Sequence, residues 1–166
     1  MQPQSFKARR GFLNTQQGFS LVELLIVVAI IGILAAIAIP NLLASRRAAN
    51  EASAISAIRT LSSVEETYRS TVGNGTQFTD MAGLRGQQLV DAQLAAATSI
   101  ATSKSGYIFS VVTIGGGINF CAGAAPVSAV TGSRNFSSDE PGVIYFHPLA
   151  VASPPISTTG GTPLNN

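Results

Sequence analysis

The longest apolar stretch of the chain runs from Leu21 to Ile39. It reads LVELLIVVAIIGILAAIAI and contains one charged residue, Glu23. As an α-helix these nineteen residues would extend about 28 Å, close to the thickness of the hydrocarbon core of a bilayer. The pattern favours a membrane-spanning helix. The alternatives are a secretory signal peptide, whose apolar core is usually shorter, and a buried core helix, which needs a larger surrounding domain.

A second helical pattern follows, and no glycine or proline interrupts it from Asn41 to Val72. Its apolar residues recur three and four positions apart, which is typical of an amphipathic helix that packs against a globular head. They are Ile55, Ile58, Leu61, Val64, Tyr68 and Val72. The cluster Gly73-Asn74-Gly75 is a helix stop. The pattern therefore predicts a long helix over residues 19–72, with the membrane segment at 19–39.

Gly32 and Pro40 both disfavour a regular helix at their positions. Pro40 cannot donate an amide hydrogen to Ala36 and its ring crowds that turn, so the helix should bend there, or end near Ile39 and restart. Gly32 lowers helix propensity by about 1 kcal/mol relative to alanine and leaves room for a second helix to approach closely.

The rest of the chain predicts a connector over residues 73–105, with a short helix at Gln87–Ala97, and a small antiparallel sheet over 106–152. The expected strands are Tyr107–Ile114, Ile118–Ala122 and Val143–His147, and a further short strand is possible at Arg134–Phe136. The triple glycine 115–117 suits a hairpin turn better than a phosphate loop, because a strand follows it. Residues 153–166 are expected to form a flexible tail or to wrap the head. The fold class is therefore α+β.

The composition also indicates a membrane protein. With 46% apolar residues, 11% charged residues and a mean hydropathy of +0.33, the chain of 166 residues is more apolar than an ordinary soluble domain. The same numbers exclude disorder. The pI is about 9.0, but after residue 18 seven cations face eight acids. Nucleic-acid binding is therefore not predicted, because it needs clustered lysine and arginine.

The residues that could carry catalysis or bind a metal are few. Cys121 is the single cysteine and is expected to be buried. His147 is the single histidine, and a triad with Asp139 and a serine would need a geometry that no motif here indicates. Asp139 and Glu140 are adjacent, so in a strand they would point to opposite faces and make a poor metal site. We therefore expect no enzyme activity, no cofactor and no bound metal.

Glu23 raises a specific question, because a carboxylate in an apolar span costs about 2.5–3.5 kcal/mol unless it reaches the interface or has a partner. No cation lies between Phe19 and Pro40. Cleavage between Gly18 and Phe19 would create an ammonium group four residues before Glu23.

These residues resemble the amino-terminal signature of type IV pilins and the related pseudopilins. The similar segment is GFSLVELLIVV from Gly18 to Val28, with a short basic leader before it and Gly32 and Pro40 after it. The head is similar more loosely, at KSGY (104–107) and DEPGVIY (139–145). The resemblance implies a pilin-like fold, in which a long amino-terminal helix packs on a small antiparallel sheet.

The resemblance also implies a role for each signature residue. A prepilin peptidase would remove the leader, residues 1–18, by cutting after Gly18, and would methylate the new amino group of Phe19. Glu23 would neutralise the Phe19 amine of a neighbouring subunit during assembly. Gly32 and Pro40 would bracket a segment that loses helical order in the fibre. Gln17 departs from the usual basic residue before the glycine.

The function implied is that of a structural subunit of a type IV pilus. The alternatives are a pseudopilin of a type II secretion system and a membrane-anchored binding protein. The implied partners are further copies of the chain, the prepilin peptidase, membrane lipid, an inner-membrane assembly platform and, indirectly, its ATPase. The cations Lys7, Arg9 and Arg10 slightly favour a cytoplasmic amino end, with the head in the periplasm before it moves to an extracellular pilus or a periplasmic pseudopilus.

Overall fold

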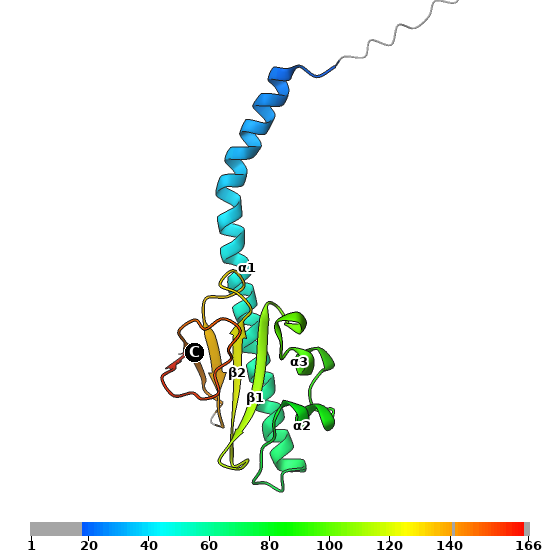
Figure 1. Ribbon diagram of the computed structural model, residues 1–166, viewed down its shortest axis with the longest axis vertical. Coiled ribbons are helices and arrows are strands. Elements are labelled where there is room, and N and C mark those ends of the chain that lie inside the picture. Colours follow the sequence, from blue (N-terminus) through cyan, green and yellow to red (C-terminus); the bar gives the residue numbers. More distant parts are fainter. Residues whose placement is uncertain (1–17, 141, 165–166) are drawn as a thin grey trace, which may run out of the picture. The chain divides into compact units, whose positions relative to one another are not determined.

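The structure is a computed structural model that describes residues 18–140 and 142–164 (Figure 1). Apart from Gly18, the expected leader lies outside the described residues. The chain divides into two units, the first ending at Ile39 and the second starting at Pro40. The helix α1 (Leu21–Thr71) contributes to both units, and the other elements belong to the second.

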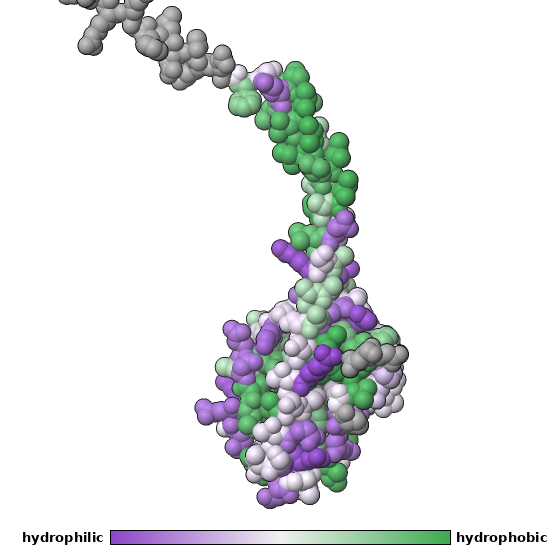
Figure 2. All heavy atoms as spheres, turned by 180° about the vertical axis from the view of Figure 1, so that it is seen from behind, coloured by the Kyte–Doolittle hydropathy of each residue, from purple (hydrophilic) through white to green (hydrophobic). Residues whose placement is uncertain are grey.

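In the first unit, α1 exposes apolar side chains on all sides. The large aliphatic residues from Leu21 to Ile39 are 48–78% exposed, and Figure 2 shows this part of α1 as almost uniformly hydrophobic. Within the described residues, α1 is the one helix long and apolar enough to cross a membrane. The helix is continuous through Gly32 and Pro40, so the alternative in which it ends near Ile39 and restarts is wrong.

In the second unit, the carboxyl-terminal half of α1 packs against the sheet. Ile58 and Leu61 are fully buried, and Ala54 and Ala57 bring the helix backbone close to its neighbours. The remaining members of the predicted stripe, Ile55, Val64 and Tyr68, pack against this core, whereas Val72 is 41% exposed and does not belong to it.

The predicted helix stop is confirmed, and it explains why Val72 lies outside the stripe. The amide of Gly73 donates to the Tyr68 carbonyl (2.9 Å), and the amide of Gly75 donates to the Arg69 carbonyl (2.8 Å). A Cβ atom at Gly73 would lie 2.0 Å from the carbonyl oxygen of Gln77, so the chain needs glycine to turn there. Val72 follows Thr71, the last residue of α1, and so lies beyond the helical stripe.

The connector holds two short helices where one was expected. A short helix, α3 (Ala92–Ala96), lies within the predicted span Gln87–Ala97 but is shorter than expected, and α2 (Met81–Gly86) precedes it. Residues 87–91 separate the two helices, and Gln88 among them has a φ of 55°. Asp80 begins α2 by accepting the Gly83 amide (2.8 Å), and Asp91 begins α3 by accepting the Leu94 amide (2.9 Å). These aspartate caps decide where the helices start. A 3₁₀ turn, η1 (Ile100–Thr102), precedes the sheet.

Five antiparallel strands form one sheet in sequence order. They are β1 (Tyr107–Ile114), β2 (Asn119–Pro126), β3 (Asn135–Ser138), β4 (Ile144–His147) and β5 (Thr162–Pro163). The bounds predicted for β1 are confirmed, as is the hairpin turn at residues 115–117, where each glycine has a positive φ. Strand β2 extends four residues beyond its predicted end at Ala122, because small residues such as Gly123 fit a covered sheet face. The strand β5 was not expected.

The two faces of the sheet are covered differently. The inner face packs on α1 and the connector through Phe109, Val111, Phe120, Ala122, Ala124 and Phe136. Residues 150–158 cross the outer face, where the Ser153 carbonyl accepts from Asn135 Nδ2 (3.3 Å) and the Ala152 amide donates to the Pro126 carbonyl (2.9 Å). Of the two paths considered for the tail, the structure gives the one that wraps the head.

The closest approach between tail and sheet is at Gly123, and it gives a test of this packing. A Cβ atom at Gly123 would lie 2.1 Å from the carbonyl oxygen of Pro155. We expect Gly123→Ala to lower the free energy of unfolding by about 1–3 kcal/mol, because the tail backbone must move. Denaturant unfolding of the detergent-solubilised protein measures the change. The control is Gly86→Ala, where nothing lies within 4 Å of the added atom. Equal stability of the two variants would contradict the tail path.

Candidate processing and assembly site

Glu23 lies at the start of α1 and closes a capping box. Its Oε2 atom accepts the backbone amide of Ser20 (2.9 Å), and Ser20 Oγ accepts the amide of Val22 (3.3 Å). The motif S-x-x-E over residues 20–23 predicts this arrangement, and the sequence analysis missed it. The carboxylate also lies favourably at the positive end of the helix dipole. Within one chain, Glu23 therefore has a hydrogen-bond partner, while no cation lies within ion-pair distance of it among the described residues.

The bond expected to be cut lies just before the helix and is open to solvent. Gly18, Phe19 and Ser20 are non-helical and exposed, and Phe19 is 89% exposed. A Cβ atom at Gly18 would meet nothing within 4 Å, so packing among the described residues does not require glycine there. A requirement for glycine at this position would therefore come from another protein.

Gly32 shows the same pattern farther along α1. A Cβ atom there would also meet nothing within 4 Å, and the helix remains regular around it. Pro40 likewise lies inside the helix. Among the described residues, nothing packs against a Cβ atom at Gly32, and Pro40 is exposed. Loss of helical order between them stays a prediction about the assembled state.

Comparison with known proteins identifies the family. The prokaryotic N-terminal methylation motif matches residues 13–39. A fimbrial protein of Pseudomonas aeruginosa is 35% identical over 111 residues, which cover 62% of this chain and 71% of that protein. The chain belongs to the family of type IV pilins and pseudopilins. No solved structure is significantly similar to it.

Two further proteins are similar to this chain over a smaller part of their own length. The type IV wide pilus major component PilA4 of Thermus thermophilus is 40% identical over 72 residues, covering 43% of this chain and 53% of the relative. The type II secretion system core protein G of Escherichia coli is 33% identical over 95 residues, covering 57% of this chain and 63% of the relative. The matched part thus spans between half and two thirds of these two proteins.

The one histidine of the head does not form a catalytic centre with Asp139. His147 Nε2 lies 2.6 Å from Ser137 Oγ, but Ser137 is completely buried. Gly161 packs against the His147 ring, since a Cβ atom there would lie 2.8 Å from it. Asp139 instead accepts the hydroxyl of Thr158 (2.9 Å). Burial lowers the pKa of His147, which favours the neutral ring.

The other candidate groups are also engaged in packing or pairing. Cys121 is fully buried, as expected, and burial raises the pKa of its thiol to about 11, with a further contribution from the Asp139 charge. Glu140 pairs with Arg69 (2.6 Å). Among the residues that the structure describes, no three histidine, cysteine, aspartate or glutamate side chains gather as a metal site.

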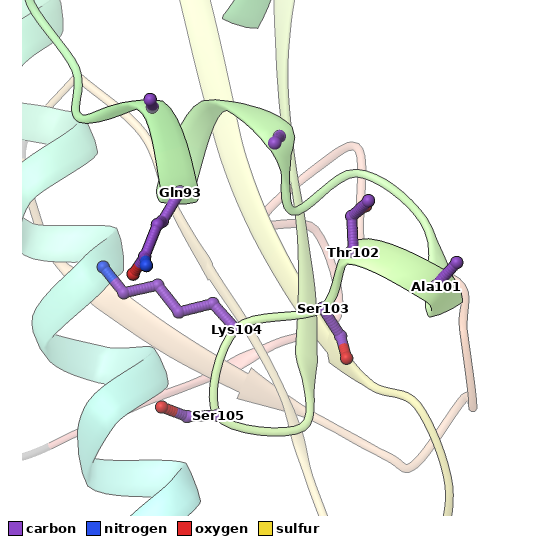
Figure 3. Close-up of a pocket in the computed structure, with 8 residues that line it drawn as sticks. Gln93, Ala101, Thr102, Ser103, Lys104 and Ser105 are labelled. Atoms are coloured by element: carbon purple, nitrogen blue, oxygen red, sulfur yellow. The ribbon is translucent and has the colours of Figure 1, made fainter.

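A wide-open hollow of about 640 Å³ lies beside α3 (Figure 3). Alanines and short polar side chains line it, and its single charged lining residue is Lys104. Figure 3 shows Lys104 extending toward Gln93, and its ammonium group pairs with Asp91 (3.5 Å). Because this charge already has a partner, the hollow offers no free charge for a ligand.

Two buried carboxylates fix α1 to the head, and the sequence analysis missed both. Glu51 accepts the Ser133 amide (2.9 Å) and hydroxyl (2.6 Å) and pairs with Arg134 (2.8 Å). Burial alone would raise the pKa of Glu51, but these bonds outweigh it and lower the pKa. Glu65 is fully buried, and its Oε2 accepts the Thr79 amide (3.1 Å) while Oε1 has no partner. Both glutamates continue the three- and four-residue spacing of the buried stripe. This spacing was the signal in the sequence that could have indicated their burial.

The environment of Glu65 predicts an unusual pH dependence. Burial, with the nearby charges of Asp80 and Glu66, raises its pKa to about 7 from 4.5, so the folded protein binds this proton more tightly than the unfolded chain. The stabilisation by this proton is present below pH 4.5 and is lost as the pH rises through about 7. We expect Glu65→Gln to remove a change of roughly 2–3 kcal/mol between pH 5 and pH 8. Unfolding curves of both proteins across this range measure it, and parallel curves would refute the assignment.

Proposed function

We propose that this chain is the structural subunit of a type IV pilus and has no catalytic role. The observation that carries the proposal is the exposed apolar helix that follows Gly18-Phe19 and contains Glu23 as its one charge before Arg46. Such a surface is stable in lipid or among equivalent helices, but not in water. The similarity to a fimbrial protein and to a major pilus component supports the same role.

In this proposal the chain is first made as a membrane-anchored precursor. Leu21–Ile39 spans the inner membrane, with the leader in the cytoplasm and the head in the periplasm. A prepilin peptidase hydrolyses the Gly18–Phe19 bond and methylates the amine that this releases on Phe19. The exposed, non-helical backbone on both sides of that bond supports access by the enzyme.

Assembly then moves the apolar helix from lipid into a bundle of identical helices. Contacts between helices replace contacts with lipid, so close packing and dispersion stabilise the bundle more than exclusion of water does. Glu23 pairs with the Phe19 amine of a neighbouring copy, which sets the stagger because an unmatched charge in this setting is costly. An assembly platform in the membrane, driven by a cytoplasmic ATPase, supplies the work.

A pseudopilin of a type II secretion system is the second candidate, and the similarity to core protein G of Escherichia coli is the observation that favours it. The two roles differ in where the polymer accumulates. A pilus subunit is the main protein of fibres sheared from the cell surface. A pseudopilin at native expression stays in the periplasm.

The processing step predicts a definite amino terminus. Mass spectrometry of the protein from its native membrane should give a chain that starts at a methylated Phe19. Gly18→Lys should leave the leader attached, because a long side chain obstructs the peptidase, while a Cβ atom at this position meets nothing within 4 Å among the described residues. The variant should accumulate at the normal level in the membrane. A wild-type chain that starts at Met1 would refute the proposal.

The charge on Glu23 can be separated from its capping role. Glu23→Gln keeps an oxygen that accepts the Ser20 amide, as glutamine also serves in capping boxes, but it removes the charge. We expect Glu23→Gln and Glu23→Ala to be cleaved normally but to yield less than about a tenth of the wild-type amount of filaments. A loss of about 1.4 kcal/mol at each contact between subunits already weakens that contact tenfold. Electron microscopy of sheared fibres and immunoblots of processed protein measure both steps. Normal filaments from Glu23→Gln would show that capping, and not charge, is required.

A further inference from the structure

The head has two opposite ends, set by the direction of its strands. In the β1–β2 pair, Tyr107 faces Pro126 at one end and Ile114 faces Asn119 at the other. The β2–β3 loop with Val130 projects from the first end and the hairpin with Ile118 from the second (Figure 1).

Helix α1 reaches both ends. Near the first end, Arg47 Nε donates to the carbonyl of Val130 (3.2 Å). Near the second end, the chain that follows α1 joins the hairpin, because the Phe78 amide donates to the Gly117 carbonyl (2.8 Å). About 30 Å of helix separates Arg46 from Glu66.

Each end exposes large aliphatic side chains. We call the first the Val130 end, and its exposed aliphatic residues are Val130 (56%), Leu149 (41%) and Val151 (45%). We call the second the Ile118 end, and its exposed aliphatic residues are Val72 (41%), Ile114 (42%) and Ile118 (65%). Gathered aliphatic side chains of this kind mark surfaces that bind another molecule.

The charges at the two ends are opposite. At the Val130 end, Glu51 is paired with Arg134, whereas Arg46 and Arg47 have no carboxylate within ion-pair distance among the described residues. At the Ile118 end, Arg69 is shared by Glu66 (2.9 Å) and Glu140 (2.6 Å). Further carboxylates lie there on Asp80 and Asp139. Even with Arg85 of α2 and with Arg59, which lines a hollow beside Gly142 and Val143, four acids face three cations among the described residues.

We propose that the Val130 end of one copy of this chain binds the Ile118 end of another copy. The inference rests on the proposed polymer and names a second contact within it. The two ends are complementary in charge and both are apolar, which favours a defined register between partners. Because the ends differ, the contact is head to tail and can repeat without closing, as a filament requires. A symmetric dimer would place like charges together, and a lipid surface would match only the basic end.

This contact joins a different pair of copies from the Glu23 contact. Pairing of Glu23 with a neighbouring Phe19 amine requires an axial displacement of roughly 6 Å, the length of four helical residues. The two ends of the head are separated by roughly 30 Å along α1, so they meet between copies displaced by about one head length. Together the two contacts would fix both the stagger of adjacent copies and the spacing of stacked ones.

Cross-linking of intact filaments tests the proposal. Val130→Cys and Ile118→Cys are combined in one chain whose buried native cysteine is replaced, Cys121→Ala, and sheared filaments are treated with a flexible bis-maleimide. We expect a ladder of dimers, trimers and longer multimers from the double variant. Each single variant should give monomers only, because the contact joins unlike ends.

The outcomes separate this inference from the proposed function. Filaments that form but give no ladder, or dimers from Val130→Cys alone, would overturn the head-to-tail contact while the polymer stands. A wild-type chain that forms no filaments in its native cell would instead overturn the proposed function, and the head contact with it.

A charge exchange gives a second test. Arg46→Glu with Arg47→Glu, and Glu66→Lys with Glu140→Lys, should each reduce filament yield at least tenfold. The four changes together should restore it to within about threefold of wild type. Arg46→Lys with Arg47→Lys is the control that keeps the charge and should assemble normally. The proposal would be refuted if the four changes together did not restore the filament yield and if less protein were found in the membrane. That result would show that the basic end contacts lipid.

Discussion

One carboxylate in an apolar helix constrains most of what this chain can do. Glu23 would cost about 2.5–3.5 kcal/mol in lipid without compensation. Its bond to the Ser20 amide satisfies one oxygen and completes the start of α1, but among the described residues the charge has no counter-ion. Under the proposed processing, removal of the leader would create an ammonium group close by in sequence, and the exposure of Phe19 would leave that group accessible to another copy. In the proposed assembly, capping within one chain and pairing between chains would therefore be successive uses of the Glu23 side chain.

Helix α1 meets two environments, and its residues change accordingly. Up to Leu43 its large apolar side chains are exposed, whereas from Glu51 onward one stripe is buried against the sheet. In the buried part, alanines allow close approach and two glutamates replace apolar residues at the ends of the stripe. Glu51 binds the β2–β3 loop and Glu65 binds the turn before α2, so each end of the buried stripe is held by a carboxylate and not by packing alone.

The sequence predicted the elements whose formation follows from apolar periodicity. It did not predict the features that depend on contacts with residues far away in the sequence. The long helix, β1 and the glycine hairpin follow from local pattern, as does the exposed signature at Gly18, Phe19 and Glu23. The two connector helices depend on single aspartate caps, which a hydrophobic pattern does not register. Strand β5 exists because β4 offers it an edge, and Glu51 is buried because Arg134, which is 83 residues away, neutralises it. No window of neighbouring residues contains such information.

The helix and the head would contribute differently to a filament. When α1 leaves lipid for other helices, little apolar surface is removed from water, so the gain depends on close packing at small residues such as Gly32. Contacts between heads form in water, where each Å² of buried apolar surface contributes about 25 cal/mol. Valine and isoleucine at the ends of the head would therefore stabilise the polymer by a mechanism that the membrane segment lacks. The charges around them then determine which ends meet, since like ends repel and unlike ends attract.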